Sequence, residues 1–218
     1  MNFDEAFPPL QNGLLVKRLN RFVVLAETAA GELRLHLPNT GRLRWLLPGT
    51  ALLYQPRHGG RTAGRVTLAK DGNVWALLDS SLAEAALPQL AKRWGWRWLA
   101  PQPKIESRRL DGLIIDKAGV ERYLEMKSAT QVEAGRACFP DAPSARARAH
   151  LEVLARRRGV LVFAVLRGDA SAFSPCAADP VFAAALCAAR TGGLKVRAVR
   201  ALIEPRGLIW DAELPIYC

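Results

Sequence analysis

Short apolar stretches alternate with turn-forming residues through the first 77 positions of the chain. Turn signals such as Pro38-Asn39-Thr40-Gly41 and Asp71-Gly72 separate these stretches, and no helical periodicity lies between them. Strands are therefore predicted over residues 13–16, 21–26, 33–37, 43–47, 51–55, 65–68 and 74–77. Short strands at this spacing, over about 70–80 residues, are typical of a small β-barrel of the OB type.

Beyond residue 80 the spacing of apolar positions predicts helices mixed with strands. Helices are predicted over residues 82–92 (capped by Ser80 or Ser81), 144–158 and 181–190. Strands are predicted over residues 93–99, 110–115, 121–127, 160–166 and 195–203. The unbroken apolar run 160–166 suits a central strand covered on both faces. This order indicates a mixed sheet with helices on its faces.

The predicted strands 110–115 and 121–127 flank Asp116-Lys117-Ala118-Gly119, which has the composition of a tight turn, so a β-hairpin is expected. Glu125 and Lys127 share one face of the second strand, because side chains two apart point the same way. Pairing across the hairpin would bring Asp111 to the same face. Two carboxylates and an ammonium group would then lie together.

A hard cation fits between two such carboxylates. Mg²⁺ is usually held by one or two carboxylates, with water and phosphate oxygens completing its shell, and Mn²⁺ favours the same oxygen ligands. A neighbouring Lys127 can then orient or deprotonate an attacking water. This pattern resembles the PD-(D/E)xK nuclease-like superfamily, in which the preceding helix often supplies another acid, here Glu84. The alternatives are a surface strand with a salt-bridged Glu-x-Lys pair and, for Glu84, an acid that favours the first helical turn.

The net charge points to a polyanionic partner. Lys and Arg number 31 against 20 acidic residues, a formal charge of +11, which favours nucleic acid. Candidate contacts to the nucleic acid are Arg18, Arg21, Arg42, Arg44, Arg97, Arg146 and His150. Asp141, in the turn after Pro140, is a candidate to support the metal site or is simply a turn acid. The three Trp residues of the 93–99 segment would either stack on bases or pack against the barrel, and His150 would be either a phosphate contact or an ordinary histidine.

The four cysteines lack C-x-x-C spacing, so no zinc site is expected. No signal-like segment and no run of membrane-spanning length are present, which predicts a cytoplasmic protein with reduced thiols and no membrane partner. The sequence also lacks a phosphate-binding GxxxxGK[ST] loop, a dinucleotide-binding GxGxxG opening a helix after a strand, and a GxSxG elbow.

Several ordered segments, among them RLNRFVVLAE (18–27), LHLPNTGRL (35–43), YLEMKSAT (123–130) and CFPDAPSARARAHLEVL (138–154), resemble the sugar fermentation stimulation protein A (SfsA) family. The resemblance implies an OB-like β-barrel, expected over residues 1–80, followed by a restriction-endonuclease-like mixed sheet flanked by helices, expected over residues 81–218. It also implies DNA binding and, from the family name, a link to the use of sugars.

Two functions follow from these observations. In one, the protein is a nuclease dependent on Mg²⁺ or Mn²⁺, in which Asp111 and Glu125 hold the cation and Lys127 activates water. In the other, it is a non-catalytic DNA-binding regulator of sugar (maltose) metabolism genes. Close carboxylates would repel a polyanion unless a cation lies between them, so metal binding is expected, whereas turnover and the choice between DNA, single strands and RNA stay open.

Overall fold

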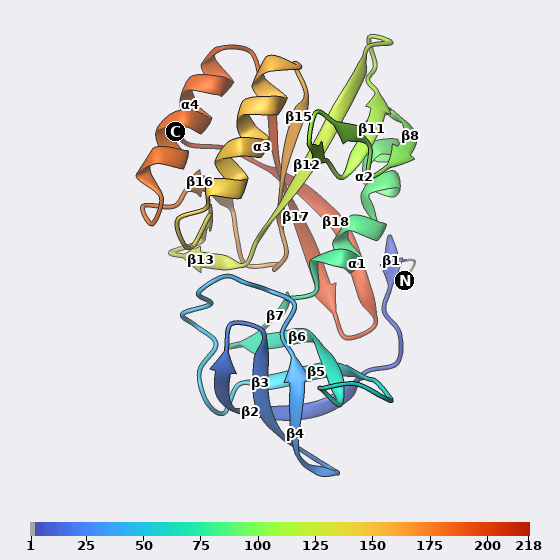
Figure 1. Ribbon diagram of the computed structural model, residues 1–218, viewed down its shortest axis with the longest axis vertical. Coiled ribbons are helices and arrows are strands. Elements are labelled where there is room, and N and C mark those ends of the chain that lie inside the picture. The colour runs from blue at the N-terminus through green and yellow to red at the C-terminus, as the bar shows by residue number, and fades with distance from the viewer. Residues whose placement is uncertain (1–2) are drawn as a thin grey trace.

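The N-terminal strands close into a barrel, at the bottom of Figure 1, in the computed structural model, which describes residues 3–218. Its strands are β2 (Gln11–Asn20), β3 (Val23–Thr28), β4 (Gly31–His36), β5 (Ala51–Pro56), β6 (Gly64–Asp71) and β7 (Val74–Leu77). They follow the order β4-β3-β2-β5-β6-β7, and a parallel pairing of β4 with β6 closes five of them into a ring. The predicted OB-like barrel is confirmed.

Alternation of apolar and polar residues builds the barrel interior. Leu15, Val24, Leu35 and Val66 are almost fully buried inside it. Irregularities in the register of β2 against β3 bend this ten-residue strand round the barrel.

The strand predicted over 43–47 is wrong, although the run LRWLL is apolar. Leu43 has a left-handed backbone, with φ of 49°, and its carbonyl accepts a 2.9 Å hydrogen bond from the Leu46 amide. The segment is therefore a turn, whose Leu43 and Leu46 side chains still pack into the barrel core.

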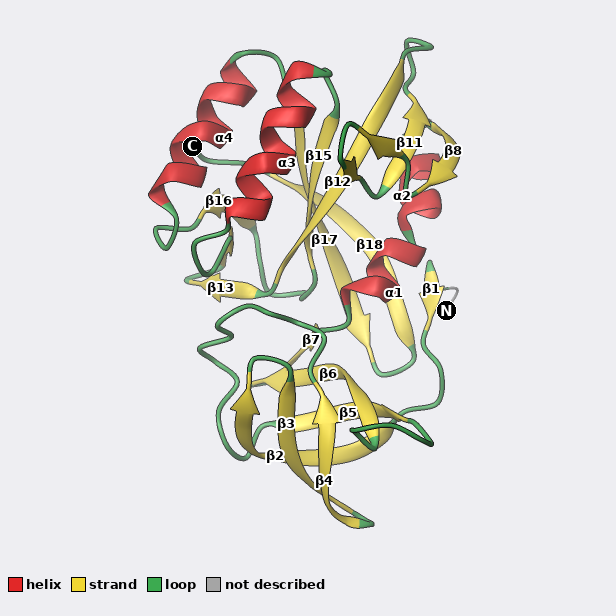
Figure 2. Ribbon diagram, viewed as in Figure 1, coloured by secondary structure: helices red, strands yellow, loops and turns green. Residues whose placement is uncertain are grey.

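The second domain is a seven-stranded mixed sheet with helices on both faces, as predicted (Figure 2). The strand order is β1-β18-β17-β15-β12-β11-β8, and the central strands β12, β15 and β17 are parallel. These strands are β1 (Glu5–Ala6), β8 (Arg97–Pro101), β11 (Gly112–Ile115), β12 (Glu121–Ala129), β15 (Val160–Val165), β17 (Lys195–Glu204) and β18 (Gly207–Leu214). The helices are α1 (Ser80–Ala85), α2 (Leu87–Arg93), α3 (Ala145–Arg156) and α4 (Pro180–Thr191).

Every residue of β15 is buried, as its apolar run predicted, because the two helix layers cover both of its faces. Val162 and Ala164 pack with α1 and α2, whereas Leu161 and Phe163 pack with α3 and α4. The N-caps of α3 and α4 are Ser144 and Asp179.

Smaller strands that were not predicted complete the domain. A three-stranded sheet is formed by β13 (Gln131–Glu133), β14 (Arg136–Phe139) and β16 (Ala172–Pro175), and β9 (Lys104–Ile105) pairs with β10 (Arg108–Arg109). A disulfide joins Cys138 in β14 to Cys176 just after β16, so the prediction of reduced thiols is wrong for this pair. Among residues 3–218, no helix is long and apolar enough to cross a membrane.

The helix predicted over 82–92 is two helices, and Asp79 rather than a serine caps the first. The strand predicted over 93–99 is also partly wrong, because α2 continues to Arg93 and Gly95 turns the chain with a φ of 69°. Trp94 and Trp96 are buried in the core, and the Arg197 guanidinium lies 4.6 and 5.1 Å from their ring centres. These two rings pack and do not present a stacking surface.

The chain begins on the second sheet and not in the barrel. Strand β1 pairs antiparallel with β18 before the chain enters β2. The boundary predicted at residue 80 coincides with the start of α1, but residues 5–6 lie outside the barrel. Two connections, one before β2 and one after β7, therefore join the barrel to its neighbour.

Candidate active site

The predicted hairpin is present and brings its acids together. Strands β11 and β12 pair antiparallel with Gly112 opposite Leu124, which sets Asp111 beside Glu125. The Asp111 amide donates to the Leu124 carbonyl (3.0 Å), and its Oδ2 accepts a 2.7 Å hydrogen bond from the Met126 amide. A Cβ at Gly112 would lie 2.4 Å from the Trp98 ring, so glycine allows the close approach that this register needs.

Glu125 lies at the centre of the site, with 2% of its surface exposed. Its Oε1 contacts both Lys127 Nζ and His150 Nδ1, the latter at 2.5 Å. Its Oε2 is buried without a hydrogen-bond partner among residues 3–218. Burial raises the pKa of Glu125, but the hydrogen bond with His150 and the charge of Lys127 outweigh it, and its pKa lies below the ordinary value.

The neighbouring acids have the opposite shift. Burial, followed by the charge of Glu125, raises the pKa of Asp111 to about 7. Burial, together with the charges of Glu125 and Asp79, also raises the pKa of Glu84 in α1. The charge of Lys127 lowers the pKa of both carboxyls but does not outweigh burial and the neighbouring carboxylates, so a cation added here would favour their charged forms.

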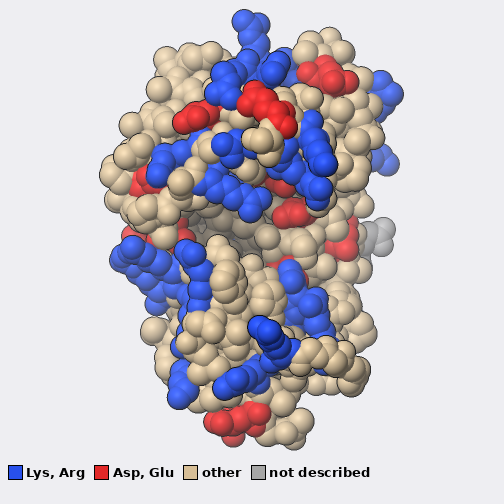
Figure 3. Space-filling view, viewed as in Figure 1, with Lys and Arg blue, Asp and Glu red and all other residues tan. Residues whose placement is uncertain are grey.

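A pocket of about 300 Å³, which we call the acid pocket, contains Glu84, Asp111, Glu125 and Lys127. Its opposite wall comes from the barrel, where residues 38–41 of the β4–β5 connection and Arg21 line it. The acid pocket therefore lies between the two domains. Figure 3 shows the surface hollowed between the two lobes, with Lys and Arg side chains on both sides.

The residues fit a divalent cation that is completed by other ligands. Among residues 3–218, no three His, Cys, Asp or Glu side chains form a ready-made metal cluster. Asp111 and the unpartnered Oε2 of Glu125 instead offer two carboxylates, the number with which Mg²⁺ is commonly bound when water and phosphate supply the rest. Glu84 lies near enough to raise the pKa of Asp111, but its role as a ligand stays a prediction.

The basic candidates fall into several groups. Arg146 of α3 lines the acid pocket, and Arg42 and Arg44 line a neighbouring pocket of about 710 Å³ together with Arg136, which sequence reasoning missed. Arg97 pairs in register with Ile115, at the turn end of the hairpin and outside both pockets.

Three further candidates have structural partners. His150 is 4% exposed and its Nδ1 contacts Glu125 Oε1 at 2.5 Å, so its ring supports that carboxylate, and a phosphate contact stays a prediction. The Arg18 guanidinium donates to the carbonyls of Asn20, Arg21, Gly41 and Arg42. Asp141 lines the acid pocket and accepts a 3.1 Å hydrogen bond from the Leu43 amide.

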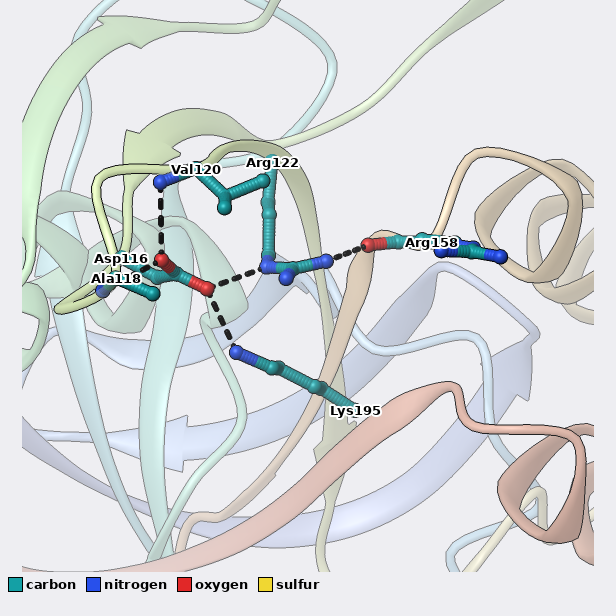
Figure 4. Close-up of polar contacts among 6 residues, drawn as sticks. All are labelled: Asp116, Ala118, Val120, Arg122, Arg158 and Lys195. Atoms are coloured by element: carbon teal, nitrogen blue, oxygen red, sulfur yellow. Dashed lines mark hydrogen bonds and ion pairs between the residues drawn. The ribbon is translucent and has the colours of Figure 1, made fainter.

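Asp116, at the hairpin turn, was read only as a turn residue, yet it is buried and fully bonded (Figure 4). Its Oδ1 accepts from the amides of Ala118 (2.9 Å) and Val120 (3.1 Å), and its Oδ2 from Arg122 Nε and Lys195 Nζ (both 2.6 Å). These contacts fix the hairpin against α3 and β17, because Arg122 also donates to the Arg158 carbonyl. The sequence Asp-Lys-Ala-Gly signals the turn but not the distant partners.

Comparison with known proteins decides the family. The family model for the sugar fermentation stimulation protein RE domain matches residues 75–207, and that for the SfsA N-terminal OB domain matches residues 16–78. The chain belongs to the SfsA family. The resemblance found in the sequence is thereby confirmed. The OB-domain model matches the part of the chain that forms the barrel, and the RE-domain model matches the part that forms the mixed sheet.

Relatives in the SfsA family cover nearly the whole chain. The sugar fermentation stimulation protein homologue of Pyrobaculum arsenaticum is 34% identical over 215 residues, 94% of this chain and 93% of that protein. The homologue from Natranaerobius thermophilus is 34% identical over 226 residues, 95% and 94% of the two chains. The solved structure of Pyrococcus furiosus SfsA in complex with Ca²⁺ is 29% identical, with a TM-score of 0.89 over 100% of both chains.

Proposed function

We propose that this protein binds nucleic acid in the interdomain pocket and hydrolyses its phosphodiester bonds with the help of Mg²⁺ or Mn²⁺. The observation that carries the proposal is the buried, unpartnered Oε2 of Glu125, beside Asp111 and next to Lys127. A buried anionic oxygen left without a donor is costly unless something positive reaches it. The Ca²⁺ in the Pyrococcus furiosus relative supports a divalent ion as that partner.

The chain's own residues have distinct parts in this proposal. Asp111 and Glu125 would hold the cation, which supplies positive charge to the scissile phosphate and to an attacking water. Lys127 is tethered to Glu125 Oε1 and therefore lies within reach of a water at that carboxylate. Arg146 in the same pocket can neutralise charge on the phosphate. His150 contacts Oε1 of Glu125 and would hold this carboxylate in place, which leaves Oε2 for the cation.

A test compares wild-type protein with Asp111→Ala, Glu125→Gln and the matched control Glu121→Gln, an exposed acid on the same strand. Labelled single- and double-stranded DNA and RNA are incubated with Mg²⁺, Mn²⁺ or a chelator, and folding is checked by circular dichroism. Cleavage should require the cation, disappear in the two pocket variants and persist in Glu121→Gln.

Binding gives a readout independent of turnover. Ca²⁺ should strengthen the binding of DNA to the wild-type protein and to Glu121→Gln but not to Glu125→Gln, because the cation bridges carboxylate and phosphate. If the wild-type protein cuts nothing and both pocket variants bind DNA at least as tightly as it does, the nuclease proposal is wrong. The alternative, a DNA-binding regulator of sugar metabolism genes, would then be favoured.

A further inference from the structure

The β4–β5 connection contains a segment, residues 38–43, that we call the strap. On its barrel side, Arg18 donates to the carbonyls of Arg42 (2.8 Å) and Gly41 (2.9 Å), and Arg21 donates to that of Thr40 (3.2 Å). Within the strap, the Asn39 side chain accepts a 2.9 Å hydrogen bond from the Gly41 amide. The strap is therefore held in one conformation against the barrel.

On its other side the strap is tied to the nuclease-like domain by Asp141. The carboxylate of Asp141 accepts from the Leu43 amide, and a Cβ at Gly41 would lie 2.5 Å from Asp141 Oδ2. Leu43 has a left-handed backbone at this contact, a strained conformation that persists where surrounding contacts enforce it. Gly41 is required by the close approach, because any side chain there would displace the Asp141 carboxylate.

A second joint holds the two domains together through Arg167, which is 3% exposed. Arg167 pairs with Asp71 of β6 (2.9 Å) and Asp169 (2.7 Å), and it donates to the Thr130 carbonyl (3.2 Å). Beside it, the Leu77 amide of β7 donates to the Leu166 carbonyl (2.9 Å). With both the strap and Arg167 in place, the separation between the domains at the acid pocket is fixed.

Basic pockets adjoin the acid pocket. The pocket of Arg42, Arg44 and Arg136 shares Gln131, Cys138 and Asp141 with it, and a pocket of about 600 Å³ that includes Arg21 shares Thr40 and Gly41. Arginine forks match phosphate oxygens well. The arginines of these adjoining pockets can thus hold a sugar–phosphate chain whose phosphate reaches the carboxylates of the acid pocket.

From this arrangement we infer that the part of the acid pocket between the strap and the carboxylates, which we call the slot, accepts an unpaired nucleic-acid strand and excludes a duplex. Asp141 enforces this selection because it holds the strap in place. The inference rests on the proposed function for its chemistry. To bring a phosphate to the buried Glu125, a duplex would have to insert a whole stack of base pairs between the domains. A single strand is only one chain thick, and positively charged grooves of OB folds and nucleic-acid enzymes hold single strands in this way.

The test uses three fluorescent probes of one sequence: a single strand of about 16 nucleotides, the upper range that one OB barrel covers, the blunt duplex, and a duplex with an unpaired overhang. Binding is measured by anisotropy with Ca²⁺ at fixed salt, and cleavage with Mn²⁺. The wild-type protein should bind the single strand at least about tenfold more tightly than the blunt duplex, and cut only unpaired nucleotides.

Two variants examine the strap. Asp141→Ala removes its acceptor, and Gly41→Ala pushes the carboxylate away while leaving all charges unchanged. Both should move the ratio of single-strand to duplex affinity toward one, whereas the control Gly192→Ala, at the end of α4 with its nearest neighbour the Ala188 carbonyl at 3.4 Å, should not. If both strap variants keep the wild-type ratio, the part assigned to Asp141 is wrong.

The outcomes separate this inference from the proposed function. Equal binding and cutting of blunt duplex and single strand by the wild-type protein would overturn the inference and leave the nuclease function standing. A preference for single strands without cleavage in any metal would support the slot and overturn the nuclease function. Failure to bind either probe would overturn both.

Discussion

The two ends of the β11–β12 hairpin each place carboxylates against the core, and their surroundings differ. At the turn end, Asp116 accepts four hydrogen bonds, two from amides and two from the cations Arg122 and Lys195. The hydrogen bonds from Lys195 and Arg122 hold the pKa of Asp116 far below its usual value. At the open end, Asp111 has a pKa raised to about 7, and one oxygen of Glu125 has no partner among residues 3–218.

This difference separates a structural carboxylate, Asp116, from the candidate metal ligands within a single hairpin. Asp116 has no capacity left to bind anything, so it stabilises the strand pair. Asp111 and Glu125 keep acceptor positions that no donor of the protein occupies. Burying these positions costs stability, and a bound cation would relieve that cost. The number of hydrogen-bond donors around each carboxylate oxygen distinguishes Asp116 from Asp111 and Glu125, whereas the distances between the acids do not.

The largest expected effect concerns Asp116. Asp116→Asn removes the negative charge that faces Arg122 and Lys195. Breaking a buried ion pair on one side typically destabilises by about 3–5 kcal/mol, and we expect the lower end of this range because the Lys195 side chain is 45% exposed. Urea denaturation at pH 7 measures this loss. The lowered pKa of Asp116 means that its stabilisation is present above the unfolded value near 3.8, so the gap between wild type and variant should narrow below about pH 4.

The control for Asp116 is Asp211→Asn. Asp211 also pairs with an arginine, Arg200, but its side chain is 29% exposed, so solvent screens the pair. We expect a loss of no more than about 1 kcal/mol there. Equal losses in the two variants would contradict the view that Asp116 is a buried anchor.

A smaller effect is expected at His150. His150→Gln should loosen Glu125 without touching the cation, and changes to groups that support a metal ligand typically lower metal affinity by about 10–100-fold. Titration calorimetry with Mn²⁺ or Ca²⁺ measures this affinity. The exposed His58 provides the matched control His58→Gln, which should bind as the wild type does. An unchanged affinity in His150→Gln would show that the ring does not position Glu125.

The smallest expected effect is a gain in stability from Asp111→Asn in metal-free protein. Because the folded pKa of about 7 exceeds the unfolded value of 3.8, the folded state holds a proton that the unfolded chain has lost. Wild-type stability therefore falls as the pH rises from 4 to 7, whereas the amide does not titrate. We expect an advantage of about 1–2 kcal/mol for the variant at pH 8, below the upper limit of about 4 kcal/mol that the shift implies.

Urea denaturation at pH 4 and pH 8 measures this advantage and provides its own control. The variant should gain most at pH 8 and least at pH 4. An advantage of equal size at both values would mean that packing and not ionisation distinguishes the two side chains.

Sequence reasoning located the hairpin and brought its three candidate site residues together because strand alternation is a local rule that tertiary packing did not override. It left His150 open between a phosphate contact and an ordinary histidine, since periodicity relates residues on one face of a helix but does not say which face is buried. It read residues 43–47 as a strand because their pattern is apolar, whereas the Leu43 backbone depends on Asp141, nearly a hundred positions later. The tryptophans of residues 93–99 were also ambiguous. Their spacing of two suggests a strand, whereas the left-handed backbone at Gly95 that turns the chain is seen only in the structure.

The pairing of β1 with β18 has a practical consequence for dividing the chain. A shortened chain that begins at Ser80 loses β1 and leaves the backbone donors and acceptors of β18 exposed along the sheet edge. Such an open edge is a template for pairing with another copy. The second domain expressed alone from Ser80 is therefore expected to self-associate. Residues 3–10 should be kept with it, because they contain the strand that covers this sheet edge.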